Sequence, residues 1–212
     1  MKTFRQFFTE APIPPEWDQG VFTPKTSFAK QLKYAIERSK KIGMGSSRVA
    51  FEIEYEGRPT ILKIAKNKKG LAQNAKEADY GLYRMYPDIT IPLIDYDEKN
   101  DEPLWIHFEK ADKMNAPMFK RLTGHSFEDF SAAIRNDEGR RNGQPEMYSV
   151  SPEAKQQFDN EDGFFYNVVD LMGNFDLLAG DLTRLANWGV YQNRPVIIDL
   201  GFRSDVMKQH YI

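Results

Sequence analysis

Near its C-terminal end the chain reads Gly180-Asp181-Leu182-Thr183-Arg184-Leu185-Ala186-Asn187-Trp188-Gly189-Val190-Tyr191-Gln192-Asn193-Arg194-Pro195-Val196-Ile197-Ile198-Asp199-Leu200-Gly201-Phe202. This pattern predicts a polar loop that holds Asp181, an apolar strand over residues 188–191, a turn over 192–195 and a second strand over 196–198 that ends at Asp199. A hairpin with a short loop brings the far ends of its two strands together.

Polar side chains should therefore converge at the open end of this hairpin, namely those of Asp181, Asn187 and Asp199. Carboxylate and carboxamide oxygens are the hard ligands that magnesium prefers, and such a group suits a magnesium–phosphate site in which one carboxylate orients a nucleophile. The alternative is structural, because Asp and Asn side chains often stabilise turns and strand ends. This stretch alone leaves both interpretations open.

The composition limits the kinds of protein that this chain can be. Its 212 residues, 41% hydrophobic and 28% charged, are typical of a soluble globular protein with one domain or two lobes. The net charge of −2 argues against nucleic-acid binding driven by bulk charge, and no apolar run is long enough for a membrane span or a secretory signal. The absence of cysteine excludes disulfides, thiolate zinc sites and thiol nucleophiles, and the three histidines are scattered. We expect a soluble protein of a cytoplasm.

Residues 1–40 are expected to form a leader, a linker and a helix. Residues 1–11 predict a short amphipathic helix, residues 12–24 carry four prolines and predict an ordered surface linker, and residues 28–39 predict a second amphipathic helix. The buried stripe of that second helix is expected to be Phe28, Leu32, Ala35 and Ile36.

A strand pair with an internal lysine follows. Alternating apolar residues predict a strand over 49–55, which a turn over 56–59 connects to a second strand over 60–65. Gly43 and Gly45 precede it, and a glycine-rich turn lets backbone N–H groups approach phosphate oxygens, although a plain loop also explains two glycines. Lys63 lies in the middle of the second strand among apolar neighbours. It is either a functional ammonium group or a lysine of an edge strand whose long side chain extends to solvent.

A long helix is predicted over residues 71–86, ended by Pro87, with a buried stripe of Leu71, Ala75, Ala78, Leu82 and Met85. Glu77 lies beside this stripe, at the boundary between core and solvent. From there it can reach Lys63 and fix the ammonium for work on a phosphate, or it is an ordinary solvated glutamate.

The rest of the chain predicts one more strand pair and then helices. The strands cover 89–96 and 104–110, after which Ser126 caps a helix with Asp129 as its capping-box partner. The later segments are a charged mobile loop over 136–144, a short helix opened by Ser151-Pro152-Glu153 and a strongly apolar helix over 163–178.

This order of elements resembles the protein-kinase-like fold. The resemblance covers most of residues 40–202 and implies an α+β, two-lobed protein with an antiparallel-sheet N-lobe over residues 41–111 and a reduced helical C-lobe over residues 112–212. Gly180-Asp181-Leu182 is more similar to small-molecule phosphotransferases of the aminoglycoside and choline kinase type than to protein kinases with His-Arg-Asp. The resemblance implies ATP and magnesium as cofactors.

The resemblance also implies a role for each matching residue. Gly43 and Gly45 match the glycine-rich loop, and Lys63 matches the strand lysine that contacts phosphates, with Glu77 as its helix partner. Phe108 would lie at the back of the adenine pocket, with Glu109 to Ala111 as the hinge. In the second lobe, Asp181 matches the catalytic aspartate and Asp199, in Asp199-Leu200-Gly201, the metal ligand of Asp-Phe-Gly.

Three departures from the family pattern bear on activity. Arg48 replaces the third glycine of the loop and is expected to crowd the phosphates or to contact them. Ala186 holds the place of the metal-binding asparagine, so Asn187 can ligate magnesium only if the loop accommodates an extra residue. After Gly201 and Phe202 only residues 203–212 follow, without an activation segment or peptide-binding helices.

The first eleven residues, Met1-Lys2-Thr3-Phe4-Arg5-Gln6-Phe7-Phe8-Thr9-Glu10-Ala11, resemble the capsid-targeting leader of internal head proteins in large tailed bacteriophages. In that group the leader is cut after a glutamate, here Glu10. The sequence thus predicts a phage nucleotide-binding, kinase-like protein in the host cytoplasm or virion head, which transfers a phosphoryl group to an unknown acceptor. The alternatives are an inactive kinase-like module that binds a host or phage protein, and a structural or ejected virion component.

Overall fold

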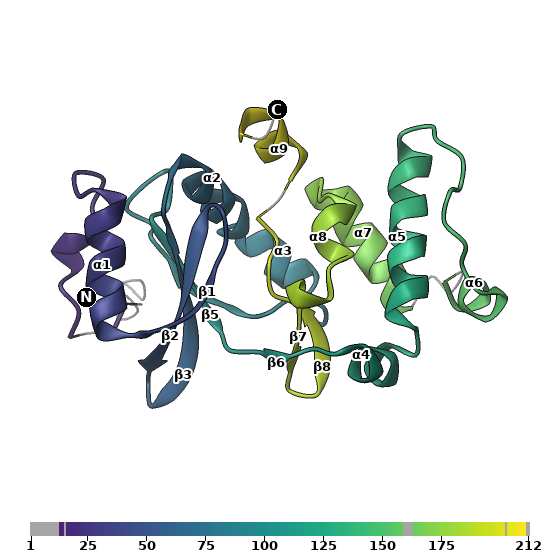
Figure 1. The fold of residues 1–212 in the computed structure, drawn as a ribbon, viewed down its shortest axis with the longest axis horizontal. Coiled ribbons are helices and arrows are strands. Elements are labelled where there is room, and N and C mark those ends of the chain that lie inside the picture. The colour runs from purple at the N-terminus through teal and green to yellow at the C-terminus, as the bar shows by residue number, and fades with distance from the viewer. Residues whose placement is uncertain (1–12, 15, 159–162, 202, 211–212) are drawn as a thin grey trace, which may run out of the picture. The chain divides into compact units, whose positions relative to one another are not determined.

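The computed structural model describes residues 13–14, 16–158, 163–201 and 203–210, and it is an α+β structure with antiparallel sheets (Figure 1). The chain divides into two compact units. Unit 1 consists of Met1–Ala78 and Leu93–Lys110, and unit 2 of Asp79–Pro92 and Ala111–Ile212. The division falls one residue before the predicted lobe boundary, and it assigns the segment Asp79–Pro92 to unit 2. The predicted leader helix over residues 1–11 lies outside the described residues.

Unit 1 is built on a five-stranded antiparallel sheet with the order β1-β2-β3-β5-β4. Its strands are β1 (Lys40–Met44), β2 (Arg48–Tyr55), β3 (Arg58–Ala65), β4 (Leu93–Tyr96) and β5 (Trp105–Glu109). The predicted hairpin of β2 and β3 is confirmed, with Tyr55 opposite Arg58. Glu56 and Gly57 form its two-residue turn, and their positive φ angles of 51° and 74° suit the twist of the strands.

The core of unit 1 lies on one face of this sheet. Val49 pairs with Ile64 and Phe51 with Leu62, and all four side chains are buried. Helix α1 (Phe28–Arg38) contributes Ala35 to the same core. The prediction that Ile36 is buried was wrong, because it is 53% exposed. Gln31, one turn before Ala35 on the same side of the helix, is buried instead, and its side chain donates to backbone carbonyls.

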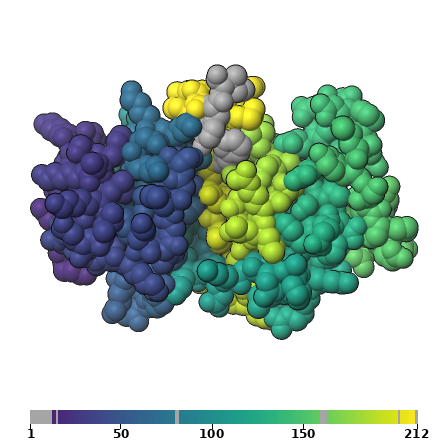
Figure 2. Space-filling view, viewed as in Figure 1, coloured from purple at the N-terminus to yellow at the C-terminus, as the bar shows by residue number. Residues whose placement is uncertain are grey.

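The proline-rich segment belongs to this core rather than lying on its surface. Ile13, Trp17 and Phe22 are buried, as is Val21 at the end of the short helix η2 (Gln19–Val21). The Trp17 ring lies 6.0 Å from Phe22 and 5.8 Å from Tyr34 of α1. These contacts make the segment part of the packed body that is purple and blue in Figure 2.

The predicted long helix is two helices, α2 (Lys68–Glu77) and α3 (Tyr80–Met85). The break coincides with the passage from unit 1 to unit 2. Leu71 is buried in the core of unit 1 and Leu82 in that of unit 2. Met85, which was expected to be buried, is 59% exposed.

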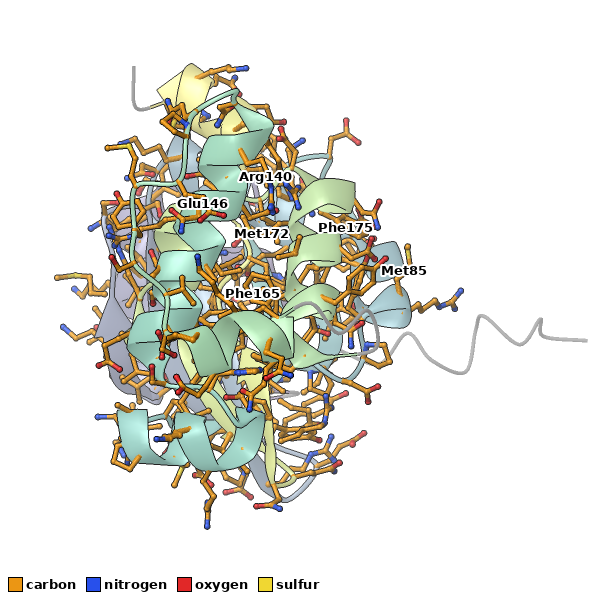
Figure 3. The ribbon with its side chains drawn as sticks, turned by 90° about the vertical axis from the view of Figure 1, so that its right-hand side faces the viewer. Met85, Arg140, Glu146, Phe165, Met172 and Phe175 are labelled. Carbon is orange, nitrogen blue, oxygen red and sulfur yellow. The ribbon has the colours of Figure 1, made fainter. Side chains whose placement is uncertain are left out.

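The described residues of unit 2 form, besides α3, seven helices, one of them 3-10, and a small antiparallel sheet of order β6-β7-β8. Its helices are α4 (Ala116–Thr123), α5 (Phe127–Arg141), α6 (Pro152–Phe158), α7 (Phe164–Phe175), α8 (Ala179–Leu182), η3 (Leu185–Asn187) and α9 (Ser204–His210), and its strands are β6 (Asp112–Lys113), β7 (Trp188–Tyr191) and β8 (Arg194–Ile197). Phe119, Phe130 and Trp188 form the aromatic centre of the core. Met172 of α7 is buried in it and Phe165 packs against it (Figure 3).

Two local predictions for unit 2 are confirmed and one is wrong. Ser126 caps α5 by accepting from the amide of Asp129, and α6 begins at Pro152. The predicted loop over 136–144 is helical as far as Arg141. The described ranges contain no helix that is long and apolar enough to cross a membrane.

Candidate functional site

Lys63, Glu77 and Phe108 form one cluster within unit 1. Nζ of Lys63 donates to both carboxylate oxygens of Glu77, at 3.2 and 3.1 Å, and lies 4.9 Å from the centre of the Phe108 ring. The Lys63 side chain is only 11% exposed and that of Glu77 1%. Lys63 is not an edge lysine, because β3 pairs with both β2 and β5. Glu77 is not a solvated helix glutamate either, so the predicted contact exists and is buried.

Small residues lie beside Lys63 on the same face of the sheet. Lys63 is opposite Ala50 on β2, and Ala50 is opposite Gly43 on β1. Directly opposed residues share a face of the sheet. The neighbours of Lys63 on that face are therefore the small residues Ala50 and, one strand further, Gly43. Gly43 therefore lies in a strand next to the predicted site rather than in the turn.

The turn between β1 and β2 is closed by its own backbone. The amide of Gly45 donates to the carbonyl oxygen of Arg48 at 2.9 Å, so this N–H is engaged within the turn. Helix α2 holds the same turn, because Asn67 Nδ2 donates to the Ser46 carbonyl oxygen at 3.0 Å and the Ser47 hydroxyl donates to Gln73. The turn is therefore fastened to α2.

Arg48 does not take the place that the sequence suggested for it. Its guanidinium donates to the two carboxylate oxygens of Glu77 at 2.8 and 3.1 Å and to Asn74 at 3.3 Å, and its side chain is 7% exposed. The expectation that Arg48 crowds or contacts a phosphate is thus replaced by an ion pair with α2. Glu77 accepts hydrogen bonds from two cations.

The predicted hinge coincides with the passage from unit 1 to unit 2 after Lys110. Glu109 ends β5 and accepts from Arg58 at 2.6 Å, while Lys110 donates to Glu52 at 2.6 Å. The hydrogen bond from Lys110 holds the pKa of Glu52 below its ordinary value. Ala111 is the first residue of the second segment of unit 2.

Asn187 links the backbone of Asp181 to the backbone of Ile198 within unit 2. Nδ2 of Asn187 donates to the backbone carbonyl of Asp181 at 3.1 Å, and the carbonyl of Asn187 accepts from the amide of Ile198 at 2.9 Å. Asp199 is the next residue. Asp181 lies in the short helix α8 rather than in the predicted loop.

Successive tight turns accommodate the extra residue before Asn187. The amide of Arg184 donates to the carbonyl of Asp181 at 3.2 Å, and the amide of Asn187 donates to that of Arg184 at 2.9 Å. This winding returns Asn187 to Asp181, although six positions separate them in the sequence.

The donor atoms at this end of the hairpin fit magnesium in kind. Asp181 and Asp199 carry carboxylate oxygens, and Asn187 uses its nitrogen for the bond to Asp181 and keeps Oδ1 as a third hard donor. In the described part of the chain, no group of three or more His, Asp or Glu side chains is arranged to hold a metal ion.

The buried polar face of α2 was missed by the sequence interpretation. Gly70, Gln73, Asn74 and Glu77 are all buried, and their spacing places them on one side of the helix. The sequence contains this spacing, but the prediction used only the apolar spacing that includes Leu71 and Ala78. A helix with a buried polar face needs partners on the element it covers, and Ser47 and Arg48 supply them.

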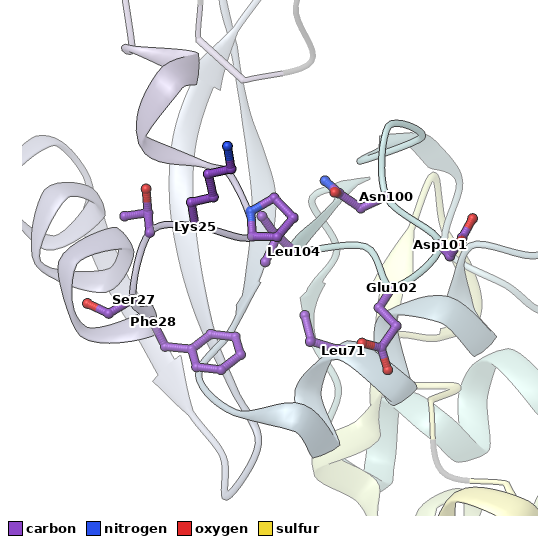
Figure 4. Close-up of a pocket in the computed structure, with 10 residues that line it drawn as sticks. Lys25, Ser27, Phe28, Leu71, Asn100, Asp101, Glu102 and Leu104 are labelled. Atoms are coloured by element: carbon purple, nitrogen blue, oxygen red, sulfur yellow. The ribbon is translucent and has the colours of Figure 1, made fainter.

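Unit 1 also contains an open pocket of about 750 Å³ (Figure 4). Its lining includes the apolar side chains of Phe28, Leu71 and Leu104 together with the charged residues Lys25, Asp101 and Glu102. None of the residues discussed above as candidate site residues lines it. Comparison of the chain with models of known protein families and with curated protein sequences finds no match.

Proposed function

We propose that this chain is a kinase-like protein of bacteriophage origin that binds ATP with magnesium and transfers a phosphoryl group. The observation that carries the proposal is the buried pair of Lys63 and Glu77, with Nζ 3.1 Å from Oε2. A buried ammonium held by a carboxylate on a neighbouring helix is a positioned cation, and phosphoryl transfer depends on positioned positive charge.

In this proposal unit 1 is the N-lobe and holds the nucleotide. Lys63 contacts the phosphates, and the small residues Gly43 and Ala50 let the ligand approach the sheet beside it. Phe108 closes the back of the adenine site, and the backbone of the segment from Glu109 to Ala111 pairs with the adenine edge. These assignments follow the resemblance residue by residue.

The carboxylates of unit 2 carry the remaining roles. Asp199 and Asn187 would hold magnesium, which neutralises charge on the transferring group. Asp181 would orient the acceptor hydroxyl and take its proton as the oxygen attacks the γ-phosphorus, while the bond to the bridging oxygen breaks and ADP leaves. Asn187 fixes the segment of Asp181 through its hydrogen bond to the backbone.

Thermal unfolding with ATP and magnesium tests this proposal. A ligand at about 100-fold its Kd stabilises the folded state by about 2.7 kcal/mol, so wild type should melt at a higher temperature. The increase in melting temperature that depends on magnesium should be lost in Asp199→Ala, and the increase that depends on the nucleotide should be smaller in Lys63→Met. Glu153→Gln, which changes an exposed carboxylate on α6, should retain both increases. No shift in wild type with ATP, ADP or magnesium would refute the proposal.

A second candidate function is a non-catalytic kinase-like module that binds a host or phage protein, in the cytoplasm or in the virion head. The engagement of the Gly45 amide within its own turn favours it, because that N–H is not presented to a phosphate. Purified virions that contain the chain shortened by cleavage after Glu10 would support the packaged form. A full-length chain found only in infected-cell lysate would contradict packaging.

A further inference from the structure

The better-bonded partner of Glu77 is Arg48 rather than Lys63. Two guanidinium nitrogens of Arg48 meet the two carboxylate oxygens at 2.8 and 3.1 Å, whereas the single ammonium of Lys63 lies 3.2 and 3.1 Å from the same oxygens. A guanidinium matches a carboxylate with two parallel hydrogen bonds and so fixes the plane of the carboxylate. An ammonium is a point charge that adapts to wherever the oxygens are.

Arg48 is itself held from two sides. Its backbone lies at the start of β2, opposite Ala65, and its guanidinium also donates to Asn74 at 3.3 Å. Asn74 is in turn anchored, because its side-chain nitrogen donates to the carbonyl of Pro103 at 2.9 Å. All of these groups are buried, so the carboxylate cannot rotate without breaking hydrogen bonds that water does not replace.

We propose that Arg48 is a positioning residue, which sets the orientation of the Glu77 carboxylate and thereby the place of the Lys63 ammonium. Arg48, which was expected to crowd or contact the phosphates, instead forms hydrogen bonds to Asn74 and Glu77 of α2. The pair of Lys63 and Glu77 is then held by groups that all belong to unit 1. The functional consequence rests on the proposed role of Lys63 at a phosphate, but the positioning itself does not.

The test that does not depend on nucleotide is the proton exchange of the Lys63 ammonium, measured by ¹⁵N NMR on the ligand-free protein. Arg48→Lys keeps the charge and removes the two-pronged geometry. Exchange should become roughly tenfold faster, the factor that matches a loss of about 1.4 kcal/mol from a charged hydrogen bond. Asn74→Ala removes one hydrogen bond of the Arg48 guanidinium but leaves the guanidinium itself in place. It should therefore accelerate the proton exchange of Lys63 by a smaller factor.

The matched control is Gln73→Met, which removes the tie between α2 and Ser47 but leaves Arg48, Glu77 and Lys63 in place. Its ammonium exchange should equal that of wild type. Equal acceleration in Gln73→Met and Arg48→Lys would mean that general loosening of α2 is responsible, and an unchanged rate in Arg48→Lys would mean that Lys63 is placed without Arg48. Either result overturns the inference.

The nucleotide measurement then separates this inference from the proposed function. If wild type binds ATP, Arg48→Lys should reduce the affinity for ATP roughly tenfold while the affinity for adenosine stays constant, because only the phosphates meet Lys63. Equal losses for ATP and adenosine would point to a structural defect and contradict positioning. If wild type binds neither, the proposed function fails, and the exchange rates still decide the role of Arg48.

Discussion

A Cβ atom on Gly70 would lie 2.3 Å from the carbonyl oxygen of Ser47, so the first turn of α2 meets the β1–β2 turn backbone against backbone. The same Cβ would be 3.0 Å from Cα of Ala65. No side chain can move aside to relieve these contacts. This approach is what allows Ser47 and Arg48 to reach the polar face of the helix.

Gly70→Ala should therefore destabilise the protein. Alanine favours a helix over glycine by about 1 kcal/mol, but forcing the two backbones apart costs more, and we expect a net loss of about 1–3 kcal/mol in urea unfolding. Gly139→Ala is the matched control in helix α5, because its Cβ would meet only the Gln144 side chain at 3.7 Å. That variant should be neutral or stabilised, and equal losses in the two variants would contradict the argument.

Glu77→Gln should be among the most destabilising single substitutions in unit 1. It leaves the cations of Arg48 and Lys63, 7% and 11% exposed, without their shared carboxylate. Removal of one partner of a buried ion pair typically costs about 3–5 kcal/mol. Glu37→Gln, at an exposed pair on α1, should change stability by less than about 0.5 kcal/mol. A comparably small effect of Glu77→Gln in denaturant titration would show that the cluster is not a stabilising ion pair.

In the turn between β7 and β8, two substitutions of Asn193 should change the stability of the protein in opposite directions. Gln192 and Asn193 both have positive φ, 49° and 62°, in a two-residue hairpin turn that favours glycine at the second place. Asn193→Gly should raise the free energy of unfolding by several tenths of a kcal/mol, while Asn193→Ala should lower it by about 1 kcal/mol. Thermal melting of the two variants checks the sign, and a stabilising alanine would contradict the assigned turn.

The link between α5 and α6 should weaken in acid. Asp129 accepts from the amide of Ser151 at 2.8 Å, and this bond is the main cause of a lowered pKa of its carboxyl group. A group whose pKa is lower in the folded state stabilises the protein fully above its unfolded pKa of about 3.9, and this contribution is lost as the pH falls through the folded value. Asp129→Asn should therefore cost stability at pH 7, and this cost should shrink progressively as the pH falls below about 3.9. A cost that is independent of pH would contradict the ionic origin of the link.

The strands and most helices could be predicted because their signals are local. The alternation of Val49, Phe51 and Ile53 specifies a half-buried strand, and Ser126 with Asp129 marks the start of a helix. The break after Ala78 could not be predicted in this way. The apolar spacing of Leu71 and Leu82 continues across it, because each stretch buries its residues in a different unit.

The contact between Lys63 and Glu77 could be predicted from the sequence, but the other hydrogen bonds of Glu77 could not. A strand lysine and a helix glutamate were matched correctly as neighbours, whereas Arg48 was assigned to a phosphate because its tertiary partner on α2 is far away in sequence. The helix end at Arg141 was missed because a run of charges was interpreted as a loop. Asp137 in fact pairs with Arg140 at 2.6 Å and with Arg141 at 2.7 Å, at helical spacing.

The segment Asp79–Pro92 belongs to unit 2 but is synthesised before the segment Leu93–Lys110 of unit 1, and this order has a consequence for biosynthesis. Ile89 and Ile91 exchange backbone hydrogen bonds with Ile197, at 2.8 and 3.2 Å, so these early residues have no partner strand until the final part of the chain has left the ribosome. A nascent chain that stalls after Lys110 would expose Leu82 and Tyr86 to solvent and to chaperones. Completion of unit 2 therefore waits for strand β8 to be synthesised, whereas all residues of unit 1 precede Ala111.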